Sequence, residues 1–224
     1  MKFKITAVIP VRKNSKRLKN KNFIPFFKKK SLLELKIEQL KKIKFIHKIV
    51  VSSDSEKAKE IAKKYNVSFH KREKYFASSI CSGSNFFQNL ANEISGDYIM
   101  YCPCTSPIIK RKSYLAFYKK FLKLRNKHDS FNTVSQLKTF IWKDAQPVNY
   151  NLYNAPNSQD LPDNYYSLTF GINIISKEKM KKMKNIVGKK PFFLVLDKLE
   201  STDINDKNDF KFAKMLYANL KNKN

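Results

Sequence analysis

The stretch ITAVIPVRKNSKRLKNKN, residues 5–22, decides the fold class of this chain. Residues 5–11 are largely apolar and rich in branched side chains, which indicates a short strand buried on both faces. A polar, basic loop completes the stretch. Ser31 and Glu34 then have the spacing of a capping box and precede a segment with helical period. A buried strand, a loop and a helix therefore open the chain, as in α/β folds.

Strand and helix patterns alternate over the next hundred residues. Strands are expected at 48–54 and from residues 67 and 97, and helices at 55–65, 84–94 and 113–124. This alternation predicts a mostly parallel sheet flanked by helices, because helical crossovers return the chain to the same end of the sheet. Apolar runs from Phe170 and Phe192 indicate two further core strands, and residues 206–220 a closing helix.

Residues 131–170 interrupt the alternation. They contain Pro147, Pro156 and Pro162, many Asn and Tyr, and little helical period. We expect this segment to project from the main sheet as a small lobe of strands and irregular loops. The chain has no repeat and no convincing linker, so residues 1–224 are expected to form one domain.

The composition is that of a basic globular protein. The 224 residues include 46 Lys and Arg against 18 Asp and Glu, a formal net charge of +28, with 42% hydrophobic residues. This hydrophobic fraction is too high for a disordered chain. Only five of the 46 cations are Arg, and Lys is spread through nearly every segment, whereas nucleic-acid readers cluster their charge on one face. Binding to nucleic acid is therefore a secondary hypothesis.

The cysteines and the hydropathy pattern bear on the compartment. Cys81, Cys102 and Cys104 form no CxxC pair, so neither a disulfide framework nor a zinc site is indicated. No apolar run reaches the roughly 18 residues of a membrane span, and no signal-peptide pattern is present. We expect a soluble cytoplasmic protein without a membrane partner.

The basic loop after the first strand is the first candidate binding site. Ligands of open parallel sheets lie beyond the carboxyl ends of the strands. Arg12, Ser15, Lys16 and Lys21 lie in this place and suit a triphosphate, with Arg12 the best bidentate donor. Neither a P-loop nor a GxGxxG pattern is present. The alternative is a solvated, Lys-rich loop, which is common in so basic a chain.

The spacing within this loop resembles a family signature. IPVRKNSKRLKNKN is similar to the IPARxGSKxxxxKN motif of the acylneuraminate (CMP-sialic acid) cytidylyltransferases, with Arg12, Ser15, Lys16, Lys21 and Asn22 in the motif positions. Six further similarities follow in the family's order: VVSSD ending at Asp54, Arg72 followed by Phe76 and Ala77, CTSP at 104–107, QDLP at 159–162, FGINII at 170–175 and STDIN at 201–205. Together they cover nearly the whole chain.

The resemblance implies a Rossmann-like nucleotidyltransferase fold and a reaction of CTP with a sugar-acid hydroxyl, with Mg²⁺ as cofactor. The product would be a CMP-sugar, with release of pyrophosphate. By the same resemblance Arg12, Lys16 and Lys21 would hold the triphosphate and act in catalysis. The remaining nucleotide-binding residues would be Ser15, Asn22, Arg72, Cys81, Ser82 and Gly83.

The metal and acceptor residues are also implied by the resemblance. Asp203 matches the metal-binding aspartate and would help to deprotonate the acceptor hydroxyl, with Asn205 as second metal ligand. Thr105, Ser106, Gln159 and Asp160 would lie on the acceptor side. Each residue also has an ordinary structural interpretation: Asp203 as a cap, Arg72 as a surface cation, Asp54 as a loop-ordering group, and Cys102 and Cys104 as packed thiols.

The sequence departs from the family pattern mostly on the acceptor side. Many relatives have an Asp at the position of Asn205. Pro103 and Ile109 replace the family's Gln and Arg, and Leu168 replaces an Arg suited to a sugar carboxylate. Lys110 or Arg111 would have to substitute for these cations, unless the acceptor is not sialic acid itself.

These departures leave several functions open. The main hypothesis is activation of a sialic-acid-like, nine-carbon keto sugar acid. The alternatives are an eight-carbon keto sugar acid, a small hydroxy or phosphorylated acceptor, or a non-enzymatic, basic nucleic-acid-binding protein. The resemblance also implies a homodimer in which the lobe of one subunit leans over the neighbour's active site.

Overall fold

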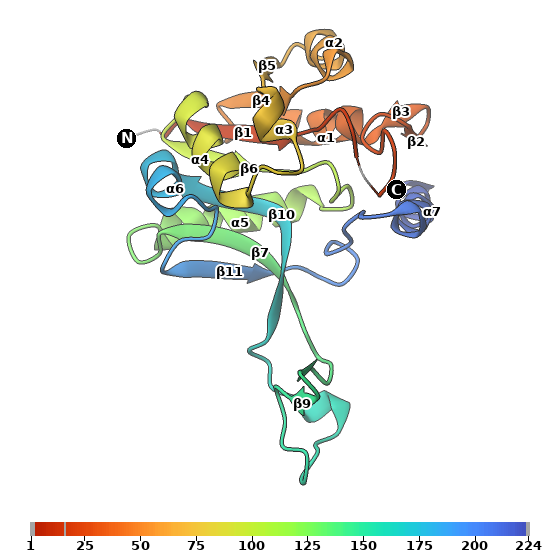
Figure 1. Ribbon diagram of the computed structural model, residues 1–224, viewed down its shortest axis with the longest axis vertical. Coiled ribbons are helices and arrows are strands. Elements are labelled where there is room, and N and C mark those ends of the chain that lie inside the picture. Colours follow the sequence, from red (N-terminus) through yellow and green to blue (C-terminus); the bar gives the residue numbers. More distant parts are fainter. Residues whose placement is uncertain (1–2, 16, 223–224) are drawn as a thin grey trace.

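The computed structural model describes residues 3–15 and 17–222 (Figure 1). A seven-stranded sheet has the order β11-β7-β10-β6-β1-β4-β5. Its strands are β1 (Ile5–Pro10), β4 (Lys48–Ser53), β5 (Ser68–Lys71), β6 (Tyr98–Tyr101), β7 (Ser130–Gln136), β10 (Tyr166–Ser176) and β11 (Pro191–Val195). Strands β6, β1, β4 and β5 are mutually parallel, as are β11 and β7, while β10 is antiparallel to both of its neighbours. The prediction of a mostly parallel sheet is confirmed.

Helices cover both faces of this sheet (Figure 1). They are α1 (Leu32–Lys41), α2 (Glu56–Lys64), α3 (Lys74–Ala77), α4 (Gly83–Glu93), α5 (Arg111–Leu124), α6 (Lys177–Met183) and α7 (Lys207–Asn222). One hydrophobic cluster joins the sheet to α1, α2, α5 and α7, and a second joins it to α4 and α6. Ala7 and Ile9 belong to the first cluster and Val8 to the second. Strand β1 is therefore buried on both faces, as its apolar run predicts.

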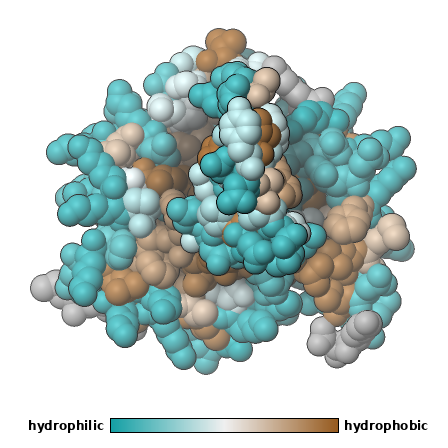
Figure 2. Space-filling view, turned by 90° about the horizontal axis from the view of Figure 1, so that it is seen from below, coloured by the Kyte–Doolittle hydropathy of each residue, from teal (hydrophilic) through white to brown (hydrophobic). Residues whose placement is uncertain are grey.

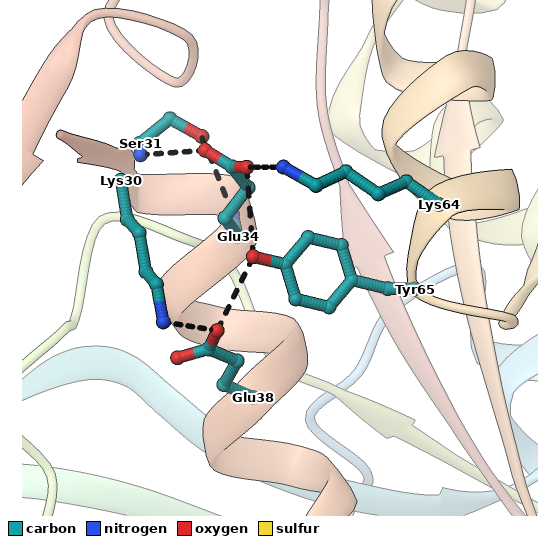
Figure 3. A network of polar contacts seen from close by, with 6 residues as sticks. All are labelled: Lys30, Ser31, Glu34, Glu38, Lys64 and Tyr65. Atoms are coloured by element: carbon teal, nitrogen blue, oxygen red, sulfur yellow. Dashed lines mark hydrogen bonds and ion pairs between the residues drawn. The ribbon is translucent and has the colours of Figure 1, made fainter.

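The capping box at the start of α1 is confirmed and belongs to a wider network (Figure 3). The Ser31 N–H donates to Glu34 Oε2 at 2.9 Å, and the Glu34 N–H donates to Ser31 Oγ at 3.3 Å. Glu34 also accepts from Lys64 at 3.0 Å, and the Tyr65 hydroxyl donates to Glu38 at 3.2 Å. Burial, together with these two carboxylates, raises the pKa of Tyr65 to about 12. The network ties the end of α2 to the first turns of α1.

The projecting lobe begins later in the sequence than expected. Residues 130–134 of β7 and 173–176 of β10 pair with the neighbouring sheet strands β11 and β6, whereas the far ends of β7 and β10 pair only with each other and lead out to residues 137–165 (Figure 1). The lobe contains the hairpin of β8 (Trp142–Lys143) and β9 (Gln146–Pro147) and the short 3₁₀ helix Ser158–Asp160. The expected start of the lobe at 131 falls inside β7, because the polar residues of this strand conceal its burial: Asn132 and Thr133 are fully buried and hydrogen-bonded.

Two smaller features complete the fold. A second hairpin, β2 (Pro25–Phe27) with β3 (Lys30–Ser31), packs against α7. No helix within residues 3–15 and 17–222 has both the length and the apolar character needed to cross a bilayer.

Candidate active site

An open cavity of about 570 Å³ lies beyond the carboxyl ends of β1, β5 and β6. Parallel α/β sheets bind their ligands at this edge. The wall combines basic, acidic and aromatic side chains drawn from five separate parts of the sequence. The lining residues are Pro10, Arg12, Arg17, Lys21, Arg72, Phe76, Ser78, Cys81, Ser82, Gly83, Phe86, Phe87, Tyr101, Pro103, Thr105, Phe170, Asp203 and Asn205.

The basic loop contributes three cations to this cavity. Arg12 and Arg17 are exposed, whereas Lys21 is only 9% exposed and donates from Nζ to the carbonyl of Ile204. Burial lowers the pKa of Lys21, and the nearby carboxylate of Asp203 opposes that shift. Arg12 and Lys21 thus face the same space, as the resemblance implies. Positive charge on one wall suits a polyphosphate.

The other loop residues of the prediction lie elsewhere. Lys16 lies outside the described residues. Ser15 is half-buried and Asn22 is buried, and neither lines the cavity. The side-chain oxygen of Asn22 is buried with no hydrogen-bond partner in the described part of the chain, while its main-chain carbonyl accepts from the N–H of Leu33. The position of Asn22 therefore connects the loop to α1.

Arg72 is a buried cation in the cavity wall, and not a surface charge. It is 3% exposed and donates through Nε to Ser52 Oγ at 3.3 Å and through Nη2 to the Ser52 carbonyl. Its guanidinium lies 4.7 Å from the ring centroid of Phe86, within cation–π range. Burial lowers the pKa of Arg72 to about 10, so the group remains charged at neutral pH. A fixed positive charge and an aromatic ring therefore stand side by side.

The turn formed by Cys81, Ser82 and Gly83 is the amino-terminal end of α4. Ser82 is the N-cap residue, and its Oγ accepts from the N–H of Asn85 at 3.1 Å. All three residues line the cavity. The unpaired N–H groups and the partial positive charge of a helix start favour negatively charged ligands. The turn therefore adds to the positive potential of the basic loop.

Asp203 and Asn205 form the acidic part of the wall. The Asn205 side-chain amide donates to Asp203 Oδ2 at 3.0 Å, and Arg17 Nη2 donates to Asn205 Oδ1 at 2.8 Å. The main-chain N–H of Asn205 is held by Asp209 at 2.8 Å. One carboxylate and one amide oxygen suit Mg²⁺, which commonly takes one or two protein oxygens together with substrate phosphates. No group of three or more His, Cys, Asp or Glu suited to a metal occurs in residues 3–15 and 17–222.

The predicted acceptor residues are not gathered in one place. Thr105 lines the cavity, but Ser106 is 2% exposed and lies behind it. Gln159 and Asp160 are exposed in the 3₁₀ helix of the lobe and do not line the cavity within one chain. Only Thr105 of the four is therefore placed to meet a ligand in this chain.

Two alternative interpretations are confirmed. Asp54 Oδ1 accepts from the main-chain N–H of Lys13 at 2.8 Å, so it orders the basic loop. Cys102 and Cys104 are buried thiols, and burial raises the pKa of each to about 12. Neither thiol can act as a nucleophile at neutral pH, because that role requires a thiolate.

Sequence reasoning counted Arg17 among the basic loop residues without giving it a role of its own, and it missed most of the aromatic lining. Arg17 stands in the same basic loop, but nothing in its spacing separates it from the neighbouring lysines. Tyr101 contacts the rings of Phe86 and Phe87 in the cavity wall. Phe170 is 40% exposed at a bulge of β10 and has a positive φ of 54°. An aromatic residue rarely adopts this backbone conformation, and such strain clusters at functional sites.

The site can now be compared with known proteins. The sequence profile of the family described as cytidylyltransferase matches residues 6–216. An N-acylneuraminate cytidylyltransferase of Escherichia coli is 27% identical over 95% of this chain, and the chain spans only about half, 52%, of that relative. A pseudaminic acid cytidylyltransferase of Campylobacter jejuni is 26% identical over 94% of this chain and 95% of the relative.

A solved structure supports the fold assignment. The 4-diphosphocytidyl-2C-methyl-D-erythritol synthase of Anaerococcus prevotii superposes with a TM-score of 0.69 over 97% of this chain and 100% of that one, at 15% identity. This similarity shows the Rossmann-like fold that the resemblance implies. Since the family profile covers nearly the whole sequence, the chain belongs to the cytidylyltransferase family.

Proposed function

We propose that this protein transfers CMP from CTP to a sialic-acid-like, nine-carbon keto sugar acid and releases pyrophosphate. One observation carries the proposal: Arg12, Lys21 and Arg72 line the same cavity as Asp203 and Asn205. Cations for a polyphosphate and oxygen ligands for a divalent cation thus share one space. The relatives named for N-acylneuraminate and pseudaminic acid support the choice of a nine-carbon acceptor.

In the proposed reaction the acceptor hydroxyl attacks the α-phosphorus of CTP. A new P–O bond forms to the sugar, and the bond to the bridging oxygen of the β-phosphate breaks, so that pyrophosphate leaves. Arg12 and Lys21 would neutralise the phosphate oxygens, because positioning and electrostatic stabilisation account for most of phosphoryl-transfer catalysis. Asp203, which lines the same cavity, would accept the hydroxyl proton.

We propose Mg²⁺ as the cofactor, held by Asp203, Asn205 and the substrate phosphates. When bound, the metal would withdraw charge from the transferred phosphate. Lys21 donates a hydrogen bond to the carbonyl of Ile204, the residue between the two ligand residues in the sequence. This bond would hold Lys21 in place to neutralise the phosphate oxygens. Because CTP is a cytoplasmic metabolite, we propose that the reaction takes place in the cytoplasm.

The acceptor carboxylate needs a cation other than those first considered. Lys110 is paired with Asp197 at 3.1 Å and Glu200 at 3.4 Å, and its pKa is raised mainly by the hydrogen bond to Asp197. Neither Lys110 nor Arg111 lines the cavity, and Ile109 is buried. Arg17 is the exposed cavity cation nearest to Asn205 and is our candidate for the carboxylate.

We further propose a homodimer built through the lobe and the neighbouring edge of the sheet. Seen from the lobe, the surface is mostly hydrophilic with separate hydrophobic areas (Figure 2). Exposed apolar side chains include Trp142 and Leu152 in the lobe and Val195 on the edge strand β11, at 50%, 49% and 48% exposure. Light scattering tests this: a monomer at micromolar concentration contradicts the dimer.

Two measurements test the proposed activity. First, thermal unfolding with Mg²⁺ and each of the four nucleoside triphosphates should show selective stabilisation by CTP, since only ligands of the native state raise the midpoint. Second, pyrophosphate release should require CTP and a nine-carbon keto sugar acid, and should be lost in Asp203→Ala. If an eight-carbon keto sugar acid or a phosphorylated acceptor is turned over faster, the assignment of a nine-carbon acceptor is wrong.

The nucleic-acid alternative makes a different prediction. It requires tight, salt-sensitive binding that survives Arg12→Ala, because release of counterions depends on the summed charge. That result, with no turnover of any sugar acid, would reject the enzymatic proposal.

A further inference from the structure

Lys36 is a fully buried lysine that the proposed chemistry does not use. It lies in α1, is 1% exposed, and extends its ammonium group into the core. Nζ donates to the Ser106 carbonyl at 2.8 Å, to Gln39 Oε1 at 2.7 Å and to the Tyr114 hydroxyl at 3.3 Å. None of these partners is a carboxylate. A buried ammonium without a counter-charge is costly, so its retention calls for a reason.

The segment that Lys36 holds has no regular secondary structure. Residues 102–110 connect β6 to α5, contain Pro103 and Pro107, and are largely buried. The Ser106 carbonyl is bonded to Lys36, and Gln39 donates from Nε2 to the Ile109 carbonyl. Buried carbonyls outside helices and sheets need other donors. Two side chains on one face of α1 therefore fix a segment that no backbone ladder holds.

This segment is hydrogen-bonded to the part of the cavity wall that contains Asp203 and Asn205. The Thr105 carbonyl, one residue before Ser106, accepts from the main-chain N–H of Ile204 at 2.9 Å. Ile204, which lies between Asp203 and Asn205 in the sequence, is fully buried, and its carbonyl accepts a hydrogen bond from Lys21 Nζ. The position of the proposed ligand pair thus depends on the position of residues 105 and 106.

We propose that Lys36 is a positioning residue for the reaction: by holding the Ser106 carbonyl it fixes Thr105, and through the Thr105–Ile204 hydrogen bond it fixes Asp203, Asn205 and Lys21. This inference rests on the proposed function. It assigns to a core lysine an effect on turnover that does not require contact with substrate.

The surroundings of Lys36 make a clean substitution available. The groups that face it from the other elements are Cys102, Cys104 and Tyr114, and burial raises the pKa of all three, so they stay neutral at pH 7. In Lys36→Met the Tyr114 hydroxyl still donates to Gln39 Oε1 at 3.1 Å. The Ser106 carbonyl is therefore the acceptor that loses its donor.

The test compares the wild type with Lys36→Met and Lys41→Met in the full chain. Lys41 is an exposed lysine of the same helix that donates to the Tyr65 carbonyl and does not line the cavity. Hydrogen exchange of residues 203–206, the CTP-induced thermal shift and kcat with the best acceptor are measured. In Lys36→Met we expect faster amide hydrogen exchange at residues 203–206 and a kcat reduced by about tenfold, because small displacements of catalytic groups are costly. The CTP shift should persist, and Lys41→Met should match the wild type.

A purely structural role predicts a different result. Faster exchange spread evenly over the chain, or an unchanged kcat in folded Lys36→Met, would overturn the proposal. If Lys36→Met does not fold, the triple variant Lys36→Met/Gln39→Met/Tyr114→Phe decides, because replacing the polar side-chain partners of Lys36 with apolar groups of similar shape limits the loss of stability, while the Ser106 carbonyl still lacks its donor. A kcat equal to that of the wild type in the triple variant would also overturn the proposal. If the wild type turns over no acceptor, the proposed function fails, while the exchange data still decide whether Lys36 positions residues 203–205.

Discussion

Arg17 donates a hydrogen bond of 2.8 Å from Nη2 to Oδ1 of Asn205, although 188 positions separate the two residues in the sequence. The bond occupies the same amide oxygen that we propose as a metal ligand. Arg17 and the cofactor would therefore compete for Asn205, and a carboxylate at this position should favour the metal.

Replacing Asn205 by Asp should lower the Mg²⁺ concentration required for half-maximal pyrophosphate release. The added charge strengthens binding of a hard cation, and we expect a change of about tenfold, or roughly 1.4 kcal/mol. Asn208→Asp adds the same charge nearby but outside the cavity. Equal Mg²⁺ titrations for the two variants would argue against Asn205 as a ligand.

Under the proposed function, Arg12→Ala should reduce kcat/KM for CTP by about 100-fold, because it would remove a preorganised charge beside the transferred phosphate. Its neighbour Lys13 is exposed and lies outside the lining of the cavity, so Lys13→Ala should stay within about twofold of the wild type. Steady-state kinetics at fixed ionic strength make the comparison. Similar losses in both variants would indicate a general effect of charge.

Cys81 should be the thiol that reacts first with a disulfide reagent in the native protein. It is half-buried in the cavity wall, whereas Cys102 and Cys104 are 0% and 1% exposed. We expect one fast-reacting thiol, slowed at least about tenfold by saturating CTP and unaffected by ATP. Cys81→Ser should abolish the fast phase. Unchanged reactivity in the presence of CTP would place the nucleotide elsewhere.

Unfolding at alkaline pH should depend on Cys102 and Cys104. Burial raises the pKa of each thiol from 9.0 to about 12, so their contribution to stability is complete below pH 9 and is lost between pH 9 and 12. Lys36 acts in the opposite sense, since burial lowers its pKa to about 8 and its contribution rises between pH 8 and 10.5.

Comparison with Cys102→Ala/Cys104→Ala separates these effects, because Lys36 is present in both proteins. Above pH 9 the unfolding free energy of the wild type should fall relative to the variant by about 1.4 kcal/mol per pH unit for each cysteine. Denaturant titrations from pH 8 to 11 measure this difference. If the unfolding free energies of the wild type and the variant change with pH in parallel, the thiols have the same pKa in the folded and unfolded states.

Gly171→Ala should destabilise the fold by about 1–3 kcal/mol, because a Cβ there would lie 2.5 Å from Ile109 Cδ1 and 3.2 Å from Thr133 Oγ1. Gly83→Ala is the control, since its Cβ would meet only Phe87, at 3.9 Å. The thermal midpoint should fall in the first variant and stay constant or rise in the second. An unchanged thermal midpoint in Gly171→Ala would show that the segment around Ile109 can shift at little cost in stability.

Local chemistry made much of this protein predictable from its sequence. Branched apolar residues at 5–11 determine a buried strand, Ser31 and Glu34 determine a helix start, and the spacing of Arg12 and Lys21 points to phosphate binding; each of these depends on residues close together in the chain. The polar residues of β7 were misread because alternation carries no information on a hydrogen-bonded Asn132 or Thr133 inside a core.

The tertiary structure alone decided which of those residues meet. It paired Arg17 with Asn205, buried Arg72 against Phe86, moved Ser106 behind the cavity and left Gln159 in the lobe. These relations join segments separated by tens to hundreds of residues, and no local periodicity encodes them. The buried ammonium of Lys36 is the clearest case: one lysine among many in the sequence, it becomes unusual only when the core closes around it.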